Sequence, residues 1–231
     1  MTTIFGMRYS DVNLAVLGAD RQSTMINGVD TPQKYIGGRK LWISDDGTYA
    51  FGHSGIRGED LIQLVNNMKT GKIDLADVIE TGKFEQLRKL NIDRLGTKRL
   101  DPSKESGFLL INRDGTTTNL YTCWPFGDVE PRIWTEIGSG AERVQDYIKS
   151  LQILNEAKSY LGNDKPMAPD DVIRVVAEGV RYAQAKDIYS SGLDMVIMTP
   201  TQTFDCFPDL QDDFAKRITA LQKKVKEKAT K

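Results

Sequence analysis

The sequence predicts an α+β fold in which two antiparallel sheets pack face to face and pairs of helices cover their outer sides. Segments with the two-residue alternation of strands occur in hairpin pairs, and Asp-Gly turns close two of these pairs. Segments with helical periodicity form two separate groups instead of alternating with single strands, which disfavours a parallel sheet. The expected order is strands, two helices, strands, two helices and strands.

The first half of the chain is expected to contain two hairpins and then two helices. Its expected strands are residues 2–9, 12–19, 40–44 and 49–52. Residues 25–38 contain several Gly and Pro residues and are expected to form a loop or an irregular edge. Apolar residues then recur at helical spacing from Arg57 to about Gly71. A second helix is expected from Asp74 to about Leu90, where Gly82 could interrupt it.

The second half is expected to contain further strands, a second pair of helices and two closing strands. Its expected strands are residues 108–111, 120–123, 134–137, 195–198 and 203–204. One helix is expected to open at Gly138-Ser139-Gly140, and Pro169 stands at a favourable first-turn position for another that runs to about Lys186. We therefore expect one domain, residues 1–210, and a charged helical tail, residues 211–231.

Composition argues against several classes of function. The net charge of −1 disfavours a nucleic-acid binder driven by bulk charge. No apolar run reaches the roughly 18–20 residues of a membrane span, and the start lacks the features of a secretory signal, so a cytoplasmic protein is expected. His53 is the only histidine, and Cys123 and Cys206 are the only cysteines. Neither a metal nor another cofactor is therefore expected.

The start of the chain carries a possible nucleophile. If Met1 is removed, Thr2 has a hydroxyl and a free α-amine on the same residue, which pairs a nucleophile with its own base. An α-amine has an ordinary pKa near ~7.7–8.0, so a sizeable share can accept a proton at neutral pH. With Met1 retained, the nitrogen is an amide and is not basic. Taken alone, Thr2 is more simply an ordinary residue, so its interpretation depends on residues farther along.

Six segments occur in an order and spacing that resemble a known family. They are Thr2-Thr3-Ile4, residues 18–24, residues 39–41, Gly52, residues 138–140 and residues 187–192. Together they make the chain similar to proteasome β-type subunits, the threonine-protease branch of the N-terminal nucleophile (Ntn) hydrolases. The resemblance covers roughly residues 2–207. It implies a four-layer αββα sandwich and assembly into rings with the active sites inside a chamber.

The resemblance assigns the central chemistry to three residues. Thr2 matches the nucleophile of a threonine-type endopeptidase that forms an acyl-enzyme intermediate. Asp20 matches an acidic residue that pairs with a lysine, and Lys40 matches that lysine. A nearby ammonium favours an anionic oxygen and lowers the pKa of a neighbouring amine, and a buried lysine needs a countercharge.

The remaining matched residues position the reacting groups. Ser139, Asp187 and Ser190 match a trio that orients the nucleophile and its amine. Gly52 matches the glycine whose backbone N–H serves as the oxyanion hole. Each residue has a simpler reading, such as a helix cap for Ser139, and their joint occurrence behind Thr2 is what favours the functional interpretation.

The resemblance also implies a substrate site and partners. The first specificity pocket is expected to be lined by Ser23, Thr24, Gly38 and Ala50, which would suit an apolar side chain. The substrate would be an unfolded protein or peptide. The expected partners are other copies of the chain in a ring or stacked rings, with residues 57–70 and 139–160 as candidate contacts, and an ATPase unfoldase.

Two departures and two alternatives remain. Ser191 stands where many active members have glycine, and two extra residues separate Thr2 from Asp20. The start at Met1 resembles the simpler bacterial HslV-type peptidases.

One alternative is a non-catalytic structural subunit of a proteasome-like ring. The other is a Thr2-dependent peptide or amide transferase, in which an amine intercepts the acyl intermediate.

Overall fold

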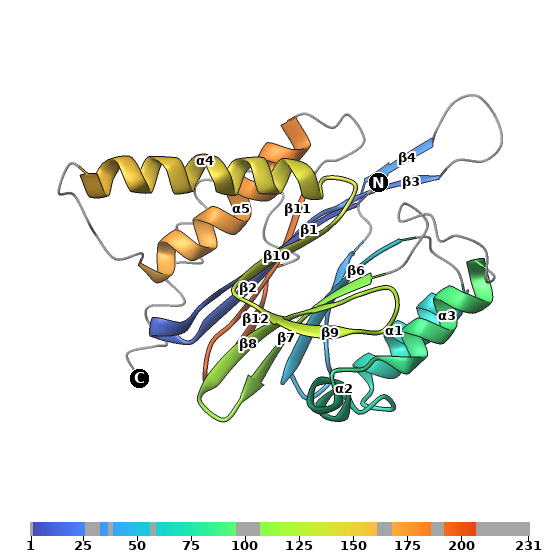
Figure 1. Cartoon of the computed structure of the whole chain (residues 1–231). Helices are drawn as coiled ribbons and strands as arrows, with labels where there is room; N and C mark the ends of the chain where they lie inside the picture. Colours follow the sequence, from blue (N-terminus) through green and yellow to red (C-terminus); the bar gives the residue numbers. More distant parts are fainter. Residues whose placement is uncertain are drawn as a thin grey trace.

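The structure is a computed structural model that describes residues 2–25, 33–36, 39–55, 59–95, 107–160, 168–185 and 192–206. In these ranges the chain is an α+β protein with two five-stranded antiparallel sheets and five α-helices (Figure 1). The predicted α+β class is therefore confirmed. The predicted tail, residues 211–231, lies outside the described residues.

The first sheet joins the start of the chain to its later strands, in the order β10-β1-β2-β11-β12. Its strands are β1 (Thr3–Tyr9), β2 (Leu14–Asp20), β10 (Trp134–Gly138), β11 (Leu193–Met198) and β12 (Thr203–Asp205). A short 3₁₀ turn, Ser10–Val12, connects β1 to β2 where the sequence predicts a turn.

The second sheet has the order β5-β6-β7-β8-β9. Its strands are β5 (Leu41–Ile43), β6 (Tyr49–Ser54), β7 (Gly107–Asp114), β8 (Thr117–Cys123) and β9 (Val129–Arg132). β9, which contains Pro131 and two charged residues, is not among the strands expected from the sequence. Proline cannot donate to a ladder and is tolerated at the edge of a sheet, which is where β9 lies.

Residues 25–38, expected to form a loop or an irregular edge, contribute to a third, two-stranded sheet. In it, β3 (Gln22–Met25) pairs antiparallel with β4 (Gln33–Ile36). Figure 1 shows this hairpin projecting beyond the two larger sheets. The Gly and Pro residues of this region hid a short strand that has no apolar alternation.

The helices follow the predicted positions with one division. They are α1 (Glu59–Lys69), α2 (Leu75–Thr81), α3 (Glu85–Leu95), α4 (Ala141–Tyr160) and α5 (Pro169–Ala185). The helix expected from Asp74 to Leu90 is two helices, because Gly82 adopts a left-handed conformation at φ 66° and ends α2. None of the helices within the described ranges has the length and apolar composition needed to cross a membrane.

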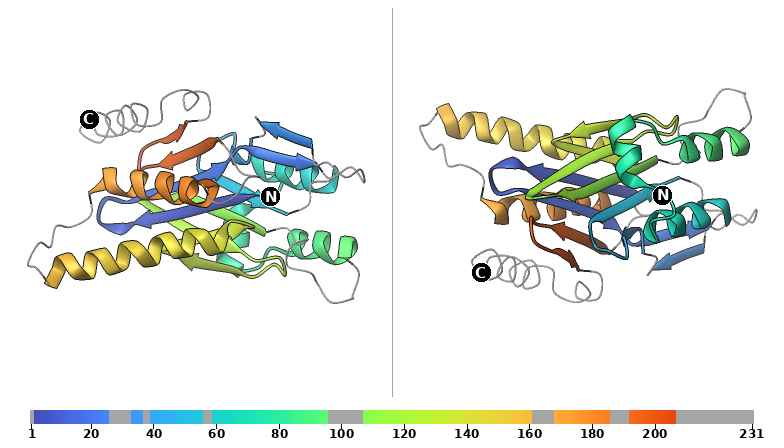
Figure 2. Two further views of the ribbon diagram at one scale, coloured as in Figure 1. Left: turned by 90° about the horizontal axis from the view of Figure 1, so that it is seen from above. Right: turned by 90° about the horizontal axis from the view of Figure 1, so that it is seen from below.

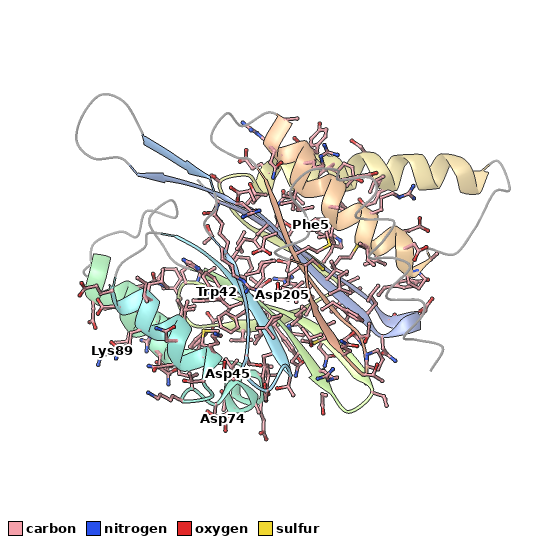
Figure 3. The ribbon with its side chains drawn as sticks, turned by 180° about the vertical axis from the view of Figure 1, so that it is seen from behind. Phe5, Trp42, Asp45, Asp74, Lys89 and Asp205 are labelled. Atoms are coloured by element: carbon pink, nitrogen blue, oxygen red, sulfur yellow. The ribbon has the colours of Figure 1, made fainter. Side chains whose placement is uncertain are left out.

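Three apolar clusters hold these elements together. One lies between α4, α5 and the first sheet and includes Phe5 and Val176. A second lies between α1–α3 and the second sheet and includes Phe51, and a third lies between the two sheets and includes Leu17 and Leu109. Figure 2 shows α5 lying over β1 and β2 with α4 beside it, and Figure 3 shows Phe5 and Trp42 on opposite sides of the paired sheets.

Strand register brings the candidate residues to one end of the first sheet. Thr3 lies opposite Gly138 of β10, and Ile4 lies opposite Ala19 of β2. Asp20, the last residue of β2, lies opposite Leu193 at the start of β11. Since neighbouring strands run antiparallel, the start of β1 meets the ends of β2 and β10 and the start of β11.

Candidate active site

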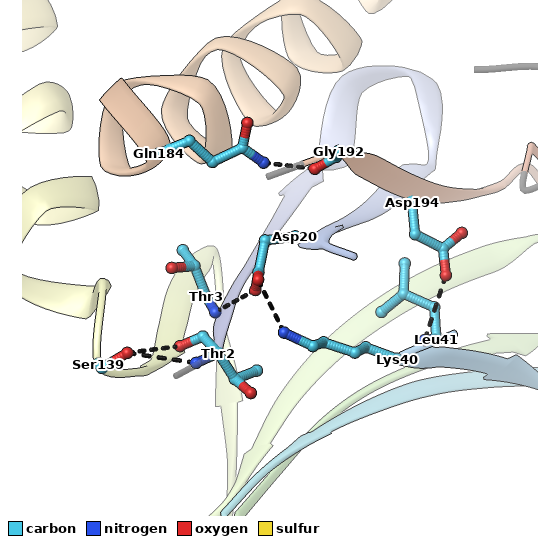
Figure 4. A network of polar contacts seen from close by, with 9 residues as sticks. All are labelled: Thr2, Thr3, Asp20, Lys40, Leu41, Ser139, Gln184, Gly192 and Asp194. Carbon is cyan, nitrogen blue, oxygen red and sulfur yellow. Dashed lines mark hydrogen bonds and ion pairs between the residues drawn. The ribbon is translucent and has the colours of Figure 1, made fainter. Parts of the chain in front are cut away.

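The candidate active site lies where the start of β1 meets the end of β2 and the turn after β10. Figure 4 shows Thr2, Thr3, Asp20, Lys40 and Ser139 gathered there. Thr2 directly precedes β1, and Lys40 directly precedes β5 of the other sheet. The site therefore lies at the edge of the interface between the two sheets.

Asp20 connects Lys40 to the beginning of the chain. Its Oδ2 accepts a hydrogen bond from Lys40 Nζ at 2.8 Å, and its Oδ1 accepts one from the Thr3 N–H at 2.6 Å. The ion pair is buried, with 3% of the Lys40 side chain and none of the Asp20 side chain exposed. Because the Thr3 nitrogen belongs to the Thr2–Thr3 peptide, one carboxylate links the lysine to the backbone of Thr2.

The pKa of the Asp20 carboxyl group is subject to opposing effects from its surroundings. Burial raises the pKa of its carboxyl, while the Lys40 ammonium, the Thr3 N–H and the chain's amino terminus act in the opposite direction. Removing one partner of a buried ion pair costs roughly 3–5 kcal/mol, because the other charge is left uncompensated. Asp20 and Lys40 therefore depend on each other.

Ser139 contacts both backbone polar atoms of Thr2. The Thr2 nitrogen lies 3.2 Å from Ser139 Oγ, to which it donates, and the Ser139 hydroxyl lies 3.4 Å from the Thr2 carbonyl oxygen. Ser139 lies between β10 and α4 and makes these contacts across 137 residues of sequence. The structure thus brings the predicted pair of Thr2 and Ser139 together.

The two glycines beside Ser139 make room for the start of the chain. A Cβ atom placed on Gly138, whose φ is 99°, would lie 1.9 Å from the Thr2 carbonyl oxygen and 3.0 Å from Ser54 Oγ. A Cβ on Gly140 would lie 2.1 Å from Thr3 Oγ1. The distances of 1.9 Å and 2.1 Å are far shorter than van der Waals contact allows, so the Gly-Ser-Gly turn fits closely around Thr2 and Thr3.

Gly52 does not lie with these groups. It is inside β6, paired with Leu41 on one side and Leu109 on the other, and a Cβ there would meet Leu41 and Ile4. In an inner antiparallel strand, successive residues direct their N–H groups to alternate neighbours. The Arg113 N–H of β7 donates to the Thr48 carbonyl, so Thr48 directs its backbone polar groups toward β7. Gly52 lies four residues later and, by the same alternation, directs its N–H toward β7 as well. This place argues against Gly52 as an oxyanion donor.

The predicted specificity residues are only partly described. Ala50 is fully buried in the cluster between the sheets, so it does not line an open pocket. Ser23 and Thr24 belong to β3, opposite Tyr35 and Lys34, and Gly38 lies outside the described residues.

Two members of the predicted positioning trio also lie outside the described residues. These are Asp187 and Ser190, together with the departure at Ser191. The described residue that follows them is Gly192, where an added Cβ would lie 3.0 Å from Arg21 Cβ, and its carbonyl accepts a hydrogen bond from Gln184.

Two contributors were missed by the sequence analysis. Asp194 of β11 is fully buried, and its Oδ2 lies 3.4 Å from the Leu41 nitrogen, next to Lys40. Ser54 ends β6 beside Gly138. Neither belongs to a recognisable motif, because each reaches the site through the pairing of strands that are remote in sequence.

The groups that converge here are a hydroxyl, a backbone nitrogen, a buried ammonium with its carboxylate, and a serine hydroxyl. This set suits proton transfer and nucleophilic attack, provided that the Thr2 nitrogen is a free amine. Within the described ranges, no three His, Cys, Asp or Glu side chains are grouped as ligands for a metal ion.

A scan of the chain against protein-family models finds no match, and a search of curated proteins finds no similar sequence.

Proposed function

We propose that this chain is a threonine-type endopeptidase whose nucleophile is Thr2 after removal of Met1. The observation that carries the proposal is the double role of Asp20, which binds Lys40 Nζ at 2.8 Å and the Thr3 N–H at 2.6 Å. With Ser139 on the Thr2 nitrogen, residues from four distant parts of the sequence meet at the first residue of the processed chain.

The α-amine of Thr2 acts as the base. It takes the hydroxyl proton as Oγ attacks a peptide carbonyl, and it returns a proton to the leaving amine. The Ser139 hydroxyl holds the amine in place. The product is an ester between Thr2 Oγ and the acyl part of the substrate, which water then hydrolyses with the same amine as base.

Lys40 supplies positive charge beside the reacting oxygen. An ammonium favours the anionic form of a nearby oxygen and disfavours protonation of a nearby amine. Asp20 keeps this ammonium buried and links it to the start of the chain, because it binds both the lysine and the backbone that carries Thr2. The methyl group of threonine restricts χ1, which aims Oγ more tightly than serine would.

We place the oxyanion donor at the end of β6 rather than at Gly52. Ser54 Oγ would lie 3.0 Å from a Cβ on Gly138, which itself packs on Thr2, so the Ser54–Gly55 end of β6 is close to the nucleophile. Gly55 has a φ of 127°, which favours glycine. A pre-oriented backbone N–H at this position stabilises a tetrahedral oxyanion by roughly 3–4 kcal/mol.

The same proposal covers the fold family. The three apolar clusters are what a four-layer αββα sandwich requires: helices on a sheet, sheet on sheet, and sheet on helices. This arrangement and the position of Thr2 at the start of β1 support membership of the Ntn hydrolases of the proteasome β type. Asp187 and Ser190 keep their proposed roles in orienting the amine.

Assembly into a ring of identical chains, fed by an ATPase unfoldase, completes the proposal. Ile62 of α1 is 57% exposed and lies in the segment expected to contact a neighbour. We expect Ile62→Asp to reduce the native mass measured by light scattering, whereas Gln63→Asp on the next, also exposed, position leaves it unchanged. A wild-type protein that is monomeric at all concentrations contradicts the ring.

The decisive experiment compares variants of the nucleophile. The amino-terminal residue of the purified protein is first identified by mass spectrometry, and turnover of fluorogenic peptides is then measured. Thr2→Ala should abolish turnover, Thr2→Ser should retain part of it, and Thr81→Ala, an exposed threonine at the end of α2, should match the wild type.

Equal turnover by wild type and Thr2→Ala contradicts the proposal. Retention of Met1 in the native protein favours the non-catalytic subunit instead. Ligated product in the presence of excess peptide amine identifies the transferase.

A further inference from the structure

A buried carboxylate that the proposed reaction does not use lies behind Lys40. Asp194 of β11 is fully buried, its Oδ2 accepts the Leu41 N–H at 3.4 Å, and its carboxyl group also interacts with the Lys40 backbone N–H. Its neighbour across the ladder is Ala19, the residue before Asp20. Adjacent strands of the first sheet therefore each direct one aspartate to the same short segment of the second sheet.

Arg39, the first residue of that segment (residues 39–41), ties the segment to β12. The Arg39 Nε donates to the Leu41 carbonyl at 2.6 Å, and Nη2 pairs with Asp205 of β12 at 2.6 Å. Figure 4 shows Asp194 meeting the backbone at Leu41 while Asp20 meets the far end of the Lys40 side chain. The contacts come from both β11 and β12, and they fix the backbone from which Lys40 extends.

A lysine ammonium is placed only if both ends of its side chain are placed. The stem has four flexible carbon–carbon links, so an unsupported backbone can shift and draw the ammonium away from its best contact with the Asp20 carboxylate. Asp20 fixes the Nζ end and Asp194 fixes the backbone end. Catalytic groups need to be held within about 0.5 Å by supporting contacts of this kind.

We propose that Asp194 is a positioning residue that holds the backbone at residues 40–41 and thereby sets the place of the Lys40 ammonium beside Thr2. The inference rests on the proposed function for its effect on turnover, but the placement of Lys40 can be measured without any activity. Asp194 touches neither the substrate nor the reacting atoms.

The contact of Asp194 with the backbone N–H groups of residues 40 and 41, here called the clamp, depends on pH. Burial raises the pKa of Asp194 to about 6, with Arg39 and the backbone N–H groups opposing the rise and Asp205 adding to it. The charged groups around the carboxylate are thus Arg39 before β5, Asp205 on β12, and the ion pair of Lys40 with Asp20. Protonation of Asp194 removes the charge that binds the two N–H groups, so the clamp weakens on the acid side of neutrality.

The first test observes Lys40 directly. In protein labelled with ¹⁵N-lysine, the buried Lys40 ammonium is assigned by the loss of its signal in Lys40→Arg. We expect Asp194→Asn to shift this signal or accelerate its proton exchange at pH 7.5. Thr122→Val, which alters a buried hydroxyl pair between β8 and β10, should leave the signal unchanged. An unchanged Lys40 signal in Asp194→Asn overturns the proposal.

The second test measures turnover. A misplacement of about 1 Å can cost roughly 100-fold in rate, so we expect Asp194→Asn to lower kcat at least tenfold while KM stays within about twofold. In the wild type, a plot of log kcat/KM against pH should have a slope of one where only the Thr2 amine protonates as pH falls. Below about pH 6, where Asp194 also protonates, the slope should become two. Asp194→Asn should keep slope one.

The outcomes separate the two proposals. If the wild type cleaves no peptide, the proposed function fails, and the Lys40 signal still decides the role of Asp194. If the wild type is active and Asp194→Asn has unchanged kcat and an unchanged pH profile, the positioning role is contradicted. A loss of kcat equal to that of Thr122→Val also contradicts it, because the effect then follows from reduced stability.

Discussion

Gly138 and Gly115 both have positive φ angles, 99° and 56°, but their surroundings are opposite. A Cβ on Gly115 would meet nothing within 4 Å, whereas one on Gly138 would lie 1.9 Å from the Thr2 carbonyl oxygen. Only Gly138 therefore combines the backbone requirement with a steric one. A left-handed conformation costs a residue with a Cβ about 1–2 kcal/mol by itself.

We predict that Gly138→Ala abolishes turnover and that Gly115→Ala leaves it unchanged. In both variants the strained backbone conformation should lower the free energy of unfolding by about 1–2 kcal/mol. The loss should be larger in Gly138→Ala, because Thr2 must also move. Peptide turnover and urea unfolding measure the two effects. Turnover by Gly138→Ala at the level of Gly115→Ala would show that Thr2 is not held by this turn.

Asp194 should make stability depend on pH. Its folded pKa, about 6, is raised above the ordinary value, so the folded state favours the protonated form. The stabilisation is fully present below the unfolded pKa near ~4 and is lost as pH rises through about 6. The difference between the folded and unfolded pKa of Asp194 corresponds to about 3 kcal/mol in the free energy of unfolding.

We therefore predict that the free energy of unfolding of the wild type, relative to Asp194→Asn, falls by up to about 3 kcal/mol between pH 4 and pH 7. Asparagine has no proton to lose in this range, so the comparison cancels the other carboxyl groups. Urea unfolding at each pH measures the difference. A constant difference across this range would mean that Asp194 has an ordinary pKa.

The contact of α5 with the first sheet depends on small residues on both sides. A Cβ on Gly18 of β2 would lie 2.7 Å from Val176 Cγ1, and one on Gly179 of α5 would lie 2.9 Å from the Phe5 ring. The helix can therefore approach β1 and β2 closely. This matters for the site, because β1 and β2 carry Thr3 and Asp20 at their ends.

We predict that Gly179→Ala destabilises the protein although alanine is the better helix former. Helix propensity contributes about 1 kcal/mol in favour of alanine, whereas overpacking of a filled interface costs about 1–3 kcal/mol. The net result should be a loss of up to about 2 kcal/mol in urea unfolding. Ser150→Ala on the exposed side of α4 serves as the control and should be close to neutral. A gain in stability for Gly179→Ala would contradict the close packing.

At the level of elements, periodicity predicted most of the fold. Hairpins around Asp-Gly turns and the apolar faces of the helices appear where the sequence places them, because turn chemistry and side-chain spacing act over a few residues. The failures have local causes as well. Pro131 disguised an edge strand, and β4 has no apolar alternation.

A buried hydrogen bond between two threonine side chains joins the two sheets. Thr122 Oγ1 of β8 and Thr135 Oγ1 of β10 lie 2.7 Å apart in the interface. The Thr122 side chain is fully buried, and that of Thr135 is 6% exposed. A hydroxyl left without its partner there loses this hydrogen bond to the facing sheet.

We predict that Thr122→Val costs about 1–3 kcal/mol, because the Thr135 hydroxyl is left buried without its partner. The double variant Thr122→Val/Thr135→Val should be no less stable than either single variant, since both polar groups are then replaced by apolar ones of similar shape. A double-mutant cycle in urea measures this coupling. Additive losses from the two single variants would contradict a shared bond.

By itself, the sequence determined the α+β class, the position of most strands and helices, and the candidate residues Thr2, Asp20, Lys40 and Ser139, because each depends on local patterns or on short motifs. Tertiary structure alone decided which groups touch. The bridge from Lys40 through Asp20 to the Thr3 N–H depends on the register of β1 and β2 and on the packing of one sheet against the other. The contact of Asp194 with residues 40–41 and the steric role of Gly138 have the same origin, since no residue carries in its local sequence the identity of a neighbour more than 100 positions away.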